Sequence, residues 1–263
     1  MRFQWLVVGG CPRSGTTAFL DCINYHNNIG LIPEYNFFNL LEKFEPIFYK
    51  EAHSRKKSWI GNINANQRGE NARVLLKDFI PTIPQISRDL KPTVKGLFSG
   101  VFPDKDLIVL GEKLPLYYKN PYRENLEKHF YPVKYIHLIR NPLYVVNSFM
   151  HRKKLTQEGK DLWKYNDLDT AMSMVQESFM FAKKNSKDKE TFLILKYEDF
   201  FNKPEQTYQT VFDYLEVPYQ EIPKFSGDKY GPLNSLTQKD IVRINKVFPS
   251  IMHWDNLPVE EIV

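Results

Sequence analysis

A phosphate-binding turn lies near the start of the chain. Residues 10–17 read Gly-Cys-Pro-Arg-Ser-Gly-Thr-Thr, with the spacing Gly-x-x-x-x-Gly-x-Thr, and stand between an apolar run and a helical pattern. A strand, a glycine-bounded turn and a helix N-terminus direct backbone N–H groups and the positive end of the helix dipole at an anion. Thr16 stands where ATP- and GTP-cleaving turns carry lysine, and Arg13 supplies a cation three residues earlier. The turn therefore predicts a phosphorylated donor other than a nucleoside triphosphate.

Basic side chains also follow the other apolar runs of the sequence. Residues 107–110 precede Lys113, residues 135–139 precede Arg140, and residues 192–195 precede Lys196. The carboxyl ends of parallel strands meet at one edge of a sheet, where ligands bind. Cations gathered at such an edge are most simply explained by a ligand with at least two separate anionic groups.

The apolar runs predict the strands of a parallel sheet. They are short, rich in valine, isoleucine and leucine, and separated by helical patterns, which is typical of an α/β fold. We therefore expect a P-loop-like three-layer fold with a central parallel sheet and helices on both faces. The expected strands are residues 5–8, 107–110, 135–139 and 192–195. The expected helices are residues 17–25, 37–48, 121–129, 143–152, 169–183, 204–215 and 237–248.

A single domain is expected to span residues 1–263, because a chain of this length buries one substantial core. Residues 54–70 are polar, and Pro81, Pro84 and Pro92 break the helical pattern that follows. We interpret residues 54–104 as a variable insertion on the acceptor side of the site.

The composition favours a small anionic ligand over nucleic acid. The net charge is only +5, and the basic residues form no long block. No apolar stretch is long enough to span a bilayer, and no cluster has metal-ligand spacing. Two cysteines, Cys11 and Cys22, make no disulfide framework. There is no Asn-x-Ser/Thr sequon, and the N-terminal apolar run resembles a strand more than a signal peptide. These features together predict a cytoplasmic location.

Two of the motifs resemble those of the sulfotransferases that use 3′-phosphoadenosine 5′-phosphosulfate (PAPS). Residues 11–17 look like the loop that binds the 5′-phosphosulfate in this family. Residues 137–142 (His-Leu-Ile-Arg-Asn-Pro), with Ser148 further along, look like its 3′-phosphate-binding motif. The resemblance extends from Arg2 to about Val247.

The resemblance implies which residues hold the two phosphates. Arg140 and Ser148 would hold the 3′-phosphate, since arginine offers the bidentate geometry that phosphate prefers. Arg13 would stabilise the charge that develops on the leaving phosphate oxygen. The 5′-phosphate would be held by backbone N–H and hydroxyl groups of Ser14, Gly15, Thr16 and Thr17.

Three further positions are implied to lie near the nucleotide. Arg152, one helical turn beyond Ser148, matches a phosphate-site arginine of the protein-tyrosine branch. Tyr197 opens a Tyr-Glu-Asp-Phe stretch whose tyrosine lies by the nucleotide in some members. Ser226 opens a late loop, residues 226–232, similar to one that closes over the nucleotide.

The acceptor side resembles two carbohydrate-directed groups of the family. Residues 33–38 (Pro-Glu-Tyr-Asn-Phe-Phe) are similar to the Glu-x-His-Phe-Phe stretch of heparan-type enzymes, which implies that Glu34 is the general base. Glu34 also falls where the base of the protein-tyrosine enzymes falls. Asn36 replaces the histidine of the heparan-type pattern.

The second acceptor-side stretch is residues 112–115 (Glu-Lys-Leu-Pro). It resembles the Glu-Lys-Ser/Thr-Pro stretch of Golgi carbohydrate enzymes, which implies that Lys113 assists the leaving group. Leu114 replaces the Ser or Thr of that pattern.

The sequence thus predicts a sulfotransferase that moves a sulfuryl group from PAPS to a hydroxyl and releases adenosine 3′,5′-bisphosphate (PAP), without a metal. A carbohydrate or glycan-bearing acceptor is favoured over a tyrosine or a small phenol or alcohol. Two other classes stay open: a P-loop kinase or NTPase, and a non-enzymatic nucleotide sensor on the same fold. The kinase requires a lysine at position 16 and an Asp for Mg²⁺ at the end of a second strand, and the sequence has Thr16 and Glu112 there.

Overall fold

The computed structural model of the chain describes residues 3–34, 91–119, 130, 133–158, 167–225 and 228–262. The predicted helices at 37–48 and 121–129, the loop at 54–70, and Ser226 lie outside the described residues. The chain divides into two compact units. The first consists of Met1–Tyr35, Asp104–Pro121 and Pro132–Val263, and the second of Asn36–Pro103 and Tyr122–Tyr131. A single domain over residues 1–263 stays a prediction.

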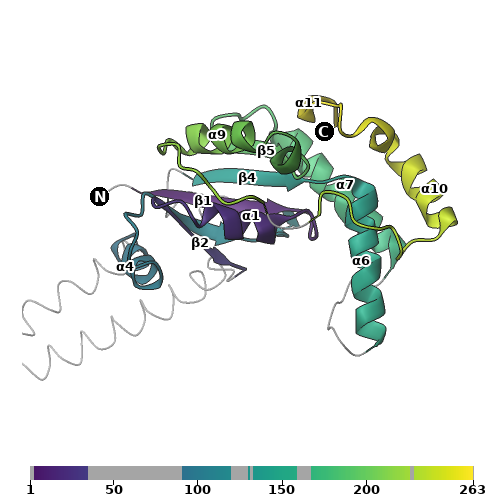
Figure 1. Cartoon of the computed structure of the whole chain (residues 1–263), viewed down its shortest axis with the longest axis horizontal. Coiled ribbons are helices and arrows are strands. Elements are labelled where there is room, and N and C mark those ends of the chain that lie inside the picture. Colours follow the sequence, from purple (N-terminus) through teal and green to yellow (C-terminus); the bar gives the residue numbers. More distant parts are fainter. Residues whose placement is uncertain are drawn as a thin grey trace, which may run out of the picture. The chain divides into compact units, whose positions relative to one another are not determined.

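Within the described residues, five strands form one parallel sheet in the order β2-β3-β1-β4-β5 (Figure 1). Their bounds are β1 Gln4–Gly10, β2 Ile29–Pro33, β3 Val109–Lys113, β4 Val133–Ile139 and β5 Phe192–Lys196. The carboxyl end of β1 therefore lies between those of β3 and β4. The predicted α/β class with a central parallel sheet is confirmed.

Strand β3 differs from the prediction because Gly111 lies inside it. We expected the strand to end at Leu110, yet it continues to Lys113. Gly111 pairs with Leu6 of β1, and a Cβ at Gly111 would lie 1.8 Å from the carbonyl oxygen of Leu6. The glycine thus permits a close approach of two strands and does not start a turn. Glu112 and Lys113 are consequently strand residues.

The helices of the first unit match the expected segments to within a few residues. They are α1 Thr16–Ile23, α6 Pro142–Gln157, α7 Leu168–Asn185, α9 Pro204–Leu215 and α10 Gln238–Val247. Short elements that the sequence did not predict are η1 Tyr117–Lys119, α8 Asp199–Asn202, η2 Pro249–His253 and α11 Val259–Ile262.

Helix α4, Lys91–Val101, belongs to the second unit and was not predicted. We expected Pro92 to break the helical pattern. Pro92 is instead the second residue of the helix, where a proline costs little because the first N–H groups of a helix have no intrahelical partner.

Helices cover both faces of the sheet. Ile136 and Leu138 of β4 belong to a buried cluster with Phe19 of α1 and Phe212 of α9. Successive strand side chains point to opposite faces, so His137 faces the other way, where its Nε2 lies 2.9 Å from the Ser178 hydroxyl of α7. The molecule therefore has the three layers that the sequence predicted.

The buried histidine of β4 is part of the core. His137 is fully buried, and its two ring nitrogens lie at hydrogen-bond distance from the hydroxyls of Tyr117 (3.1 Å) and Ser178 (2.9 Å). Burial lowers the pKa of His137 from 6.5 to about 3. The ring is therefore neutral at physiological pH.

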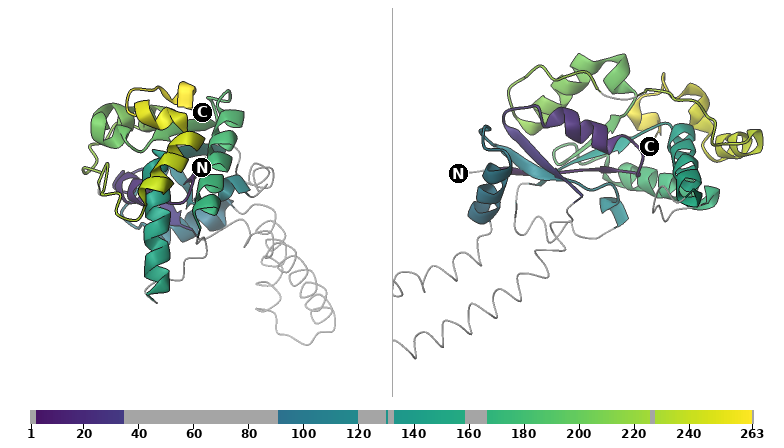
Figure 2. Two further views of the ribbon diagram at one scale, coloured as in Figure 1. Left: turned by 90° about the vertical axis from the view of Figure 1, so that its right-hand side faces the viewer. Right: turned by 60° about the horizontal axis from the view of Figure 1, so that its bottom comes forward.

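Helix α10 packs beside α6, as two further views show (Figure 2). It starts with a capping box, in which Thr237 and Asp240 satisfy each other's backbone N–H groups. Among the described residues, no helix is both long and apolar enough to cross a membrane. A cytoplasmic location stays a prediction.

Candidate functional site

The turn that links β1 to α1 has an unusual backbone. Gly10, Arg13 and Gly15 have φ values of +143°, +73° and +93°. Positive φ is uncommon for a residue with a side chain, and such strain is typical of functional turns. Gly15 caps α1 in the left-handed conformation and offers no side-chain cap, and the first N–H groups of a helix have no intrahelical partner.

Gly15 also lies against an aromatic ring from the far side of the sequence. A Cβ at Gly15 would lie 2.1 Å from Cδ2 of Tyr197, which follows β5. The Tyr197 side chain is buried, and burial raises its pKa. Its hydroxyl donates a hydrogen bond of 3.1 Å to the carbonyl of Asp228. Tyr197 therefore connects the turn to the loop that follows residue 227.

Ser14 is used within the turn. Its hydroxyl (2.6 Å) and its backbone N–H (3.1 Å) both lie within hydrogen-bond distance of the carbonyl of Cys11, and the residue is fully buried. Thr16 is buried, whereas Thr17 is exposed. The Ser14 hydroxyl and N–H, which we expected to hold the 5′-phosphate, thus contact the turn itself, and a role of Ser14 in phosphate binding stays a prediction.

Arg140 follows β4 and contacts the turn directly. Its guanidinium donates to the carbonyls of Arg13 (3.4 Å), Asp228 (3.3 Å) and Lys229 (3.4 Å). The guanidinium carbon lies 4.0 Å from the centre of the Tyr197 ring, at cation–π distance. Among the described residues, Arg140 Nε is buried without a hydrogen-bond partner. The two predicted phosphate-binding groups therefore adjoin each other at the edge of the sheet.

Helix α6 brings a second group to the turn. Arg13 Nε donates a hydrogen bond of 2.9 Å to the hydroxyl of Ser148. Arg152 lies one helical turn further along and is partly buried. The predicted 5′- and 3′-phosphate sites thus share a direct contact between Arg13 and Ser148.

The predicted acceptor-side residues also meet. Strands β2 and β3 are neighbours, and the N–H of Glu34 donates to the carbonyl of Lys113 at 2.7 Å. The Lys113 ammonium forms an ion pair with the Glu34 carboxylate and donates to the Thr17 hydroxyl at 3.2 Å. Lys113 is 3% exposed, whereas the Glu34 side chain is 57% exposed. Glu34 therefore opens to solvent beside α1 and is oriented by a buried cation.

Lys196 differs from the expectation that a cation at the end of β5 faces the ligand. It is buried and donates to the carbonyls of Trp254 (2.6 Å) and Leu257 (3.0 Å). Burial lowers its pKa. Lys196 therefore holds the C-terminal segment, and the cations near the turn are Arg13, Lys113 and Arg140.

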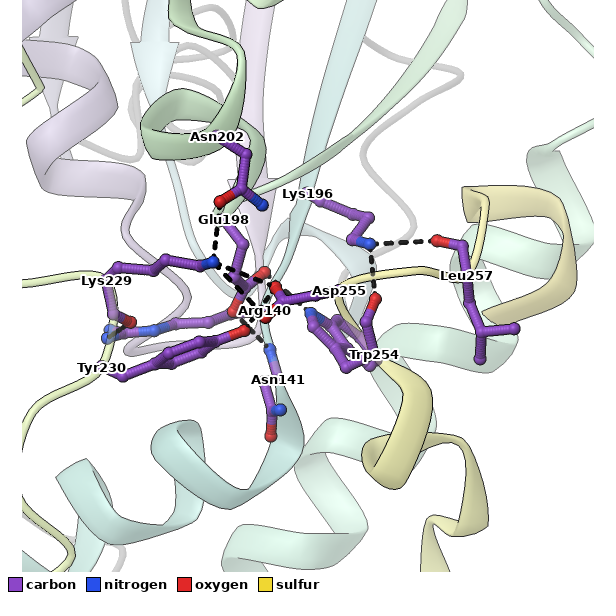
Figure 3. Close-up of polar contacts among 10 residues, drawn as sticks. All are labelled: Arg140, Asn141, Lys196, Glu198, Asn202, Lys229, Tyr230, Trp254, Asp255 and Leu257. Carbon is purple, nitrogen blue, oxygen red and sulfur yellow. Dashed lines mark hydrogen bonds and ion pairs between the residues drawn. The ribbon is translucent and has the colours of Figure 1, made fainter.

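Glu198 is a residue of the site that the sequence did not single out. It is fully buried, and one carboxylate oxygen accepts the backbone N–H of Asn141 at 3.0 Å, while the other accepts the indole N–H of Trp254 at 2.8 Å (Figure 3). Burial raises the pKa of Glu198. Glu198 thus fixes the backbone immediately after Arg140. Its place in the Tyr-Glu-Asp-Phe stretch was the available signal.

The residues present fit a doubly anionic nucleotide. The start of α1, the Arg140 guanidinium and Arg13 offer N–H donors and positive charge at one edge, which suits phosphate groups. The buried Nε of Arg140 is a donor that the described protein groups leave unused. In the part of the chain that the structure describes, no group of three His, Cys, Asp or Glu residues could hold a metal ion.

The described structure has a P-loop-like α/β fold in which Arg13, Lys113 and Arg140 lie around the turn after β1. The family model described as "Sulfotransferase family" matches residues 6–221. The chain belongs to the sulfotransferase family. This membership favours the sulfotransferase expectation over the P-loop kinase that the sequence had left open.

Solved structures support the same fold. A sulfotransferase domain from the curacin biosynthetic pathway has 21% identity and a TM-score of 0.52, over 98% of this chain and 92% of that chain. A sulfotransferase domain from the olefin synthase of Synechococcus PCC 7002 has 17% identity and a TM-score of 0.53, over 98% and 89%. A sulfotransferase from Alicyclobacillus acidocaldarius has 15% identity and a TM-score of 0.53, over 97% and 96%. A comparison with curated proteins gives no match.

Proposed function

We propose that the chain transfers a sulfuryl group from PAPS to a hydroxyl acceptor and releases PAP. The observation that supports this most is the contact between the Arg140 guanidinium and the carbonyl of Arg13. The Arg13 side chain in turn donates a hydrogen bond to the Ser148 hydroxyl. Two groups suited to separate phosphates thus lie side by side. A nucleotide with a 5′- and a 3′-phosphate is the ligand that uses both.

The donor side of the reaction requires positive charge and fixed N–H groups. PAPS, when bound, supplies an activated sulfuryl group attached to a phosphate that can leave. The N–H groups at the start of α1 would hold the 5′ end, while Arg140 and Ser148 would hold the 3′-phosphate, with Arg152 and Tyr197 alongside. Transfer of this kind depends mainly on positioning and electrostatic stabilisation.

Arg13 and Lys113 would stabilise the charge of the leaving phosphate. The Lys113 ammonium contacts Thr17 at the start of α1 on one side and Glu34 on the other. It therefore stands between the expected donor and acceptor positions. Fixed cations at such a point lower the barrier, and one donor is typically worth about 3 kcal/mol.

Glu34 would take the proton from the acceptor hydroxyl. An alcohol is a weak nucleophile, so a carboxylate within hydrogen-bond reach must remove its proton during attack. The Glu34 carboxylate is more than half exposed and fixed by Lys113, which leaves it accessible to an incoming hydroxyl.

A carbohydrate or glycan-bearing acceptor remains the preferred proposal. It rests on the resemblance of residues 33–38 and 112–115 to stretches of carbohydrate enzymes. Transfer of labelled sulfate from PAPS to a panel of sugars, tyrosine peptides, phenols and alcohols tests this preference. Greater turnover with phenols or tyrosine peptides than with sugars would contradict the proposal of a glycan acceptor.

Replacing Glu34 by Gln is the test of the mechanism. We expect turnover to fall about 100- to 10,000-fold, because the general base is lost. PAP affinity, measured by calorimetry, should stay within about twofold of the unmodified protein, because Arg140 and the turn are intact. Normal turnover in Glu34→Gln together with tight PAP binding would instead favour the nucleotide sensor.

Glu216 provides a matched control. Like Glu34 (φ +37°), it has a positive φ (+56°), and it has an exposed carboxylate and an ion pair of 2.6 Å with a mostly buried lysine, Lys134. It lies beyond α9, in a turn that supplies none of the proposed site residues. Glu216→Gln should keep turnover, so equal loss in both variants would argue against a specific role for Glu34.

A further inference from the structure

Arg140 contacts the late loop that the sequence motifs singled out at residues 226–232. Its guanidinium contacts the carbonyls of Asp228 and Lys229 at 3.3 and 3.4 Å. Charge-assisted hydrogen bonds are normally shorter, about 2.7–2.9 Å. Together with the Tyr197 ring and the Arg13 carbonyl, these long contacts surround the guanidinium without saturating its N–H donors.

Asp255 fixes this loop by two side-chain contacts. Its carboxylate accepts a hydrogen bond of 2.6 Å from the Tyr230 hydroxyl and one of 3.3 Å from the Lys229 ammonium. Although burial opposes it, the hydrogen bonds from Tyr230 and Lys229, the charge of Lys229 and a hydrogen bond from Asn202 hold the pKa of Asp255 below its ordinary value. The Tyr230 ring also stacks on Tyr144 of α6 at 4.5 Å, so the loop has a defined place over the helix.

Asp255 is itself fixed from the core. The preceding residue, Trp254, is 2% exposed and donates its indole N–H to the buried Glu198. Lys196 holds the Trp254 carbonyl. Glu198 also accepts the N–H of Asn141, next to Arg140 (Figure 3). One buried carboxylate therefore connects the backbone beside Arg140 to the segment that carries Asp255.

We propose that Asp255 is a positioning residue for the 3′-phosphate half of the site. It acts through the side chains of Lys229 and Tyr230, which hold the loop whose Asp228 and Lys229 carbonyls contact the Arg140 guanidinium. This inference rests on the proposed function, because it assumes that Arg140 binds the 3′-phosphate. Asp255 itself need not touch the nucleotide.

The test compares two nucleotides that differ only in the 3′-phosphate. Dissociation constants for PAP and for adenosine 5′-monophosphate are measured by calorimetry, and their ratio reports the 3′-phosphate contribution. In Asp255→Ala we expect PAP affinity to fall about tenfold, the size of one hydrogen bond to a charged group. Affinity for the monophosphate should be unchanged. Equal weakening of both nucleotides would overturn the proposal.

Two milder variants keep the test valid if Asp255→Ala does not fold. Tyr230→Phe removes one hydroxyl and leaves the stack on Tyr144. Asp255→Asn keeps an acceptor for Tyr230 but loses the charge that faces Lys229. Each should lower the preference for PAP by less than Asp255→Ala does. If both bind PAP as the unmodified protein does, the proposal is wrong.

Asp240→Ala is the control for a purely structural effect. Asp240 is another acidic residue in the C-terminal part of the chain, and its carboxylate and backbone N–H hydrogen-bond to Thr237 in the capping box of α10. The variant should lower the melting temperature and leave the nucleotide ratio unchanged. If the ratio of the two dissociation constants also changes in Asp240→Ala, a general loss of stability is enough to weaken PAP binding. That result would overturn the specific role of Asp255.

A double-mutant cycle separates this inference from the proposed function. In an Arg140→Ala background, Asp255→Ala should have no further effect on PAP affinity. If the unmodified protein does not prefer PAP over the monophosphate, the proposed function fails and the inference fails with it. If the preference exists and depends on Arg140 but not on Asp255, only the inference fails.

Discussion

At the scale of single residues, the geometry of the site depends on a glycine at position 15. Gly15 has φ +93° and lies against the ring of Tyr197, which in turn lies under Arg140. Any side chain at position 15 would meet both an unfavourable backbone conformation and an aromatic ring. The residue thus connects the turn geometry to the position of Arg140.

Gly15→Ala should therefore damage both stability and nucleotide binding. The left-handed conformation costs a residue with a side chain about 1–3 kcal/mol, and the new Cβ would lie 2.1 Å from the ring. We expect the free energy of unfolding in urea to fall by at least about 1 kcal/mol. PAP affinity should fall at least about tenfold, equivalent to about 1.4 kcal/mol.

Gly100→Ala is the matched control for this substitution. Gly100 lies in α4, and a Cβ there would meet nothing within 4 Å. Alanine favours a helix by about 0.5–1 kcal/mol over glycine, so the variant should be at least as stable as the unmodified protein. A tolerated Gly15→Ala, indistinguishable from this control, would contradict the geometry of the turn.

The residues that the sequence could predict are those with local patterns. Gly15 and Arg13 belong to a recognisable spacing, and Arg140 follows a strand directly. Asp255 had no such pattern, because its partners Lys229 and Tyr230 lie about 25 residues earlier. Contacts between distant segments depend on packing, and a single sequence does not display them.

At the scale of elements, the parallel strands set which side chains meet at the site. Strands β1, β3, β4 and β5 were predictable because each contains a continuous apolar run. A strand that is buried on both faces of a parallel sheet requires such a run. Strand β2 was missed because it contains Gly30 and ends at Pro33, residues that normally indicate a turn. As an edge strand, β2 tolerates its proline.

The buried His137 of strand β4 should make the stability of the protein depend on pH. Burial lowers the pKa of His137 to about 3 in the folded state, whereas its ordinary value is 6.5. Between these values the unfolded chain binds a proton that the folded chain does not. The contribution of His137 to the free energy of unfolding is therefore fully present above pH 6.5 and is lost as the pH falls toward 3. The free energy of unfolding should change by at most about 1.4 kcal/mol per pH unit because of this group.

Urea unfolding at several pH values between 7.5 and 4.5, about the span of this titration, measures the slope. His137→Gln cannot titrate, so it should be less stable at neutral pH but lose less stability on acidification. His26, whose pKa is also lowered by burial, is present in both proteins and cancels in the comparison. Identical slopes in both proteins would contradict the assignment to His137.

At the scale of the whole molecule, the order of the strands explains why two distant motifs form one site. β1 lies between β3 and β4, so the turn after β1 has Lys113 on one side and Arg140 on the other. The sequence predicted the class of fold and the strand ends that carry charge. It did not predict that Trp254 and Asp255 of the C-terminal segment would contact Glu198 and the loop beside Arg140.

The central claim is that this edge binds one adenosine nucleotide through two separate phosphates. Calorimetric titration of the unmodified protein with PAP and with ATP plus Mg²⁺ tests it most directly. We predict that PAP binds more tightly, because Thr16 replaces the lysine that reaches a β/γ-phosphate and Arg140 favours a 3′-phosphate. Tighter binding of ATP with Mg²⁺ than of PAP would contradict this account.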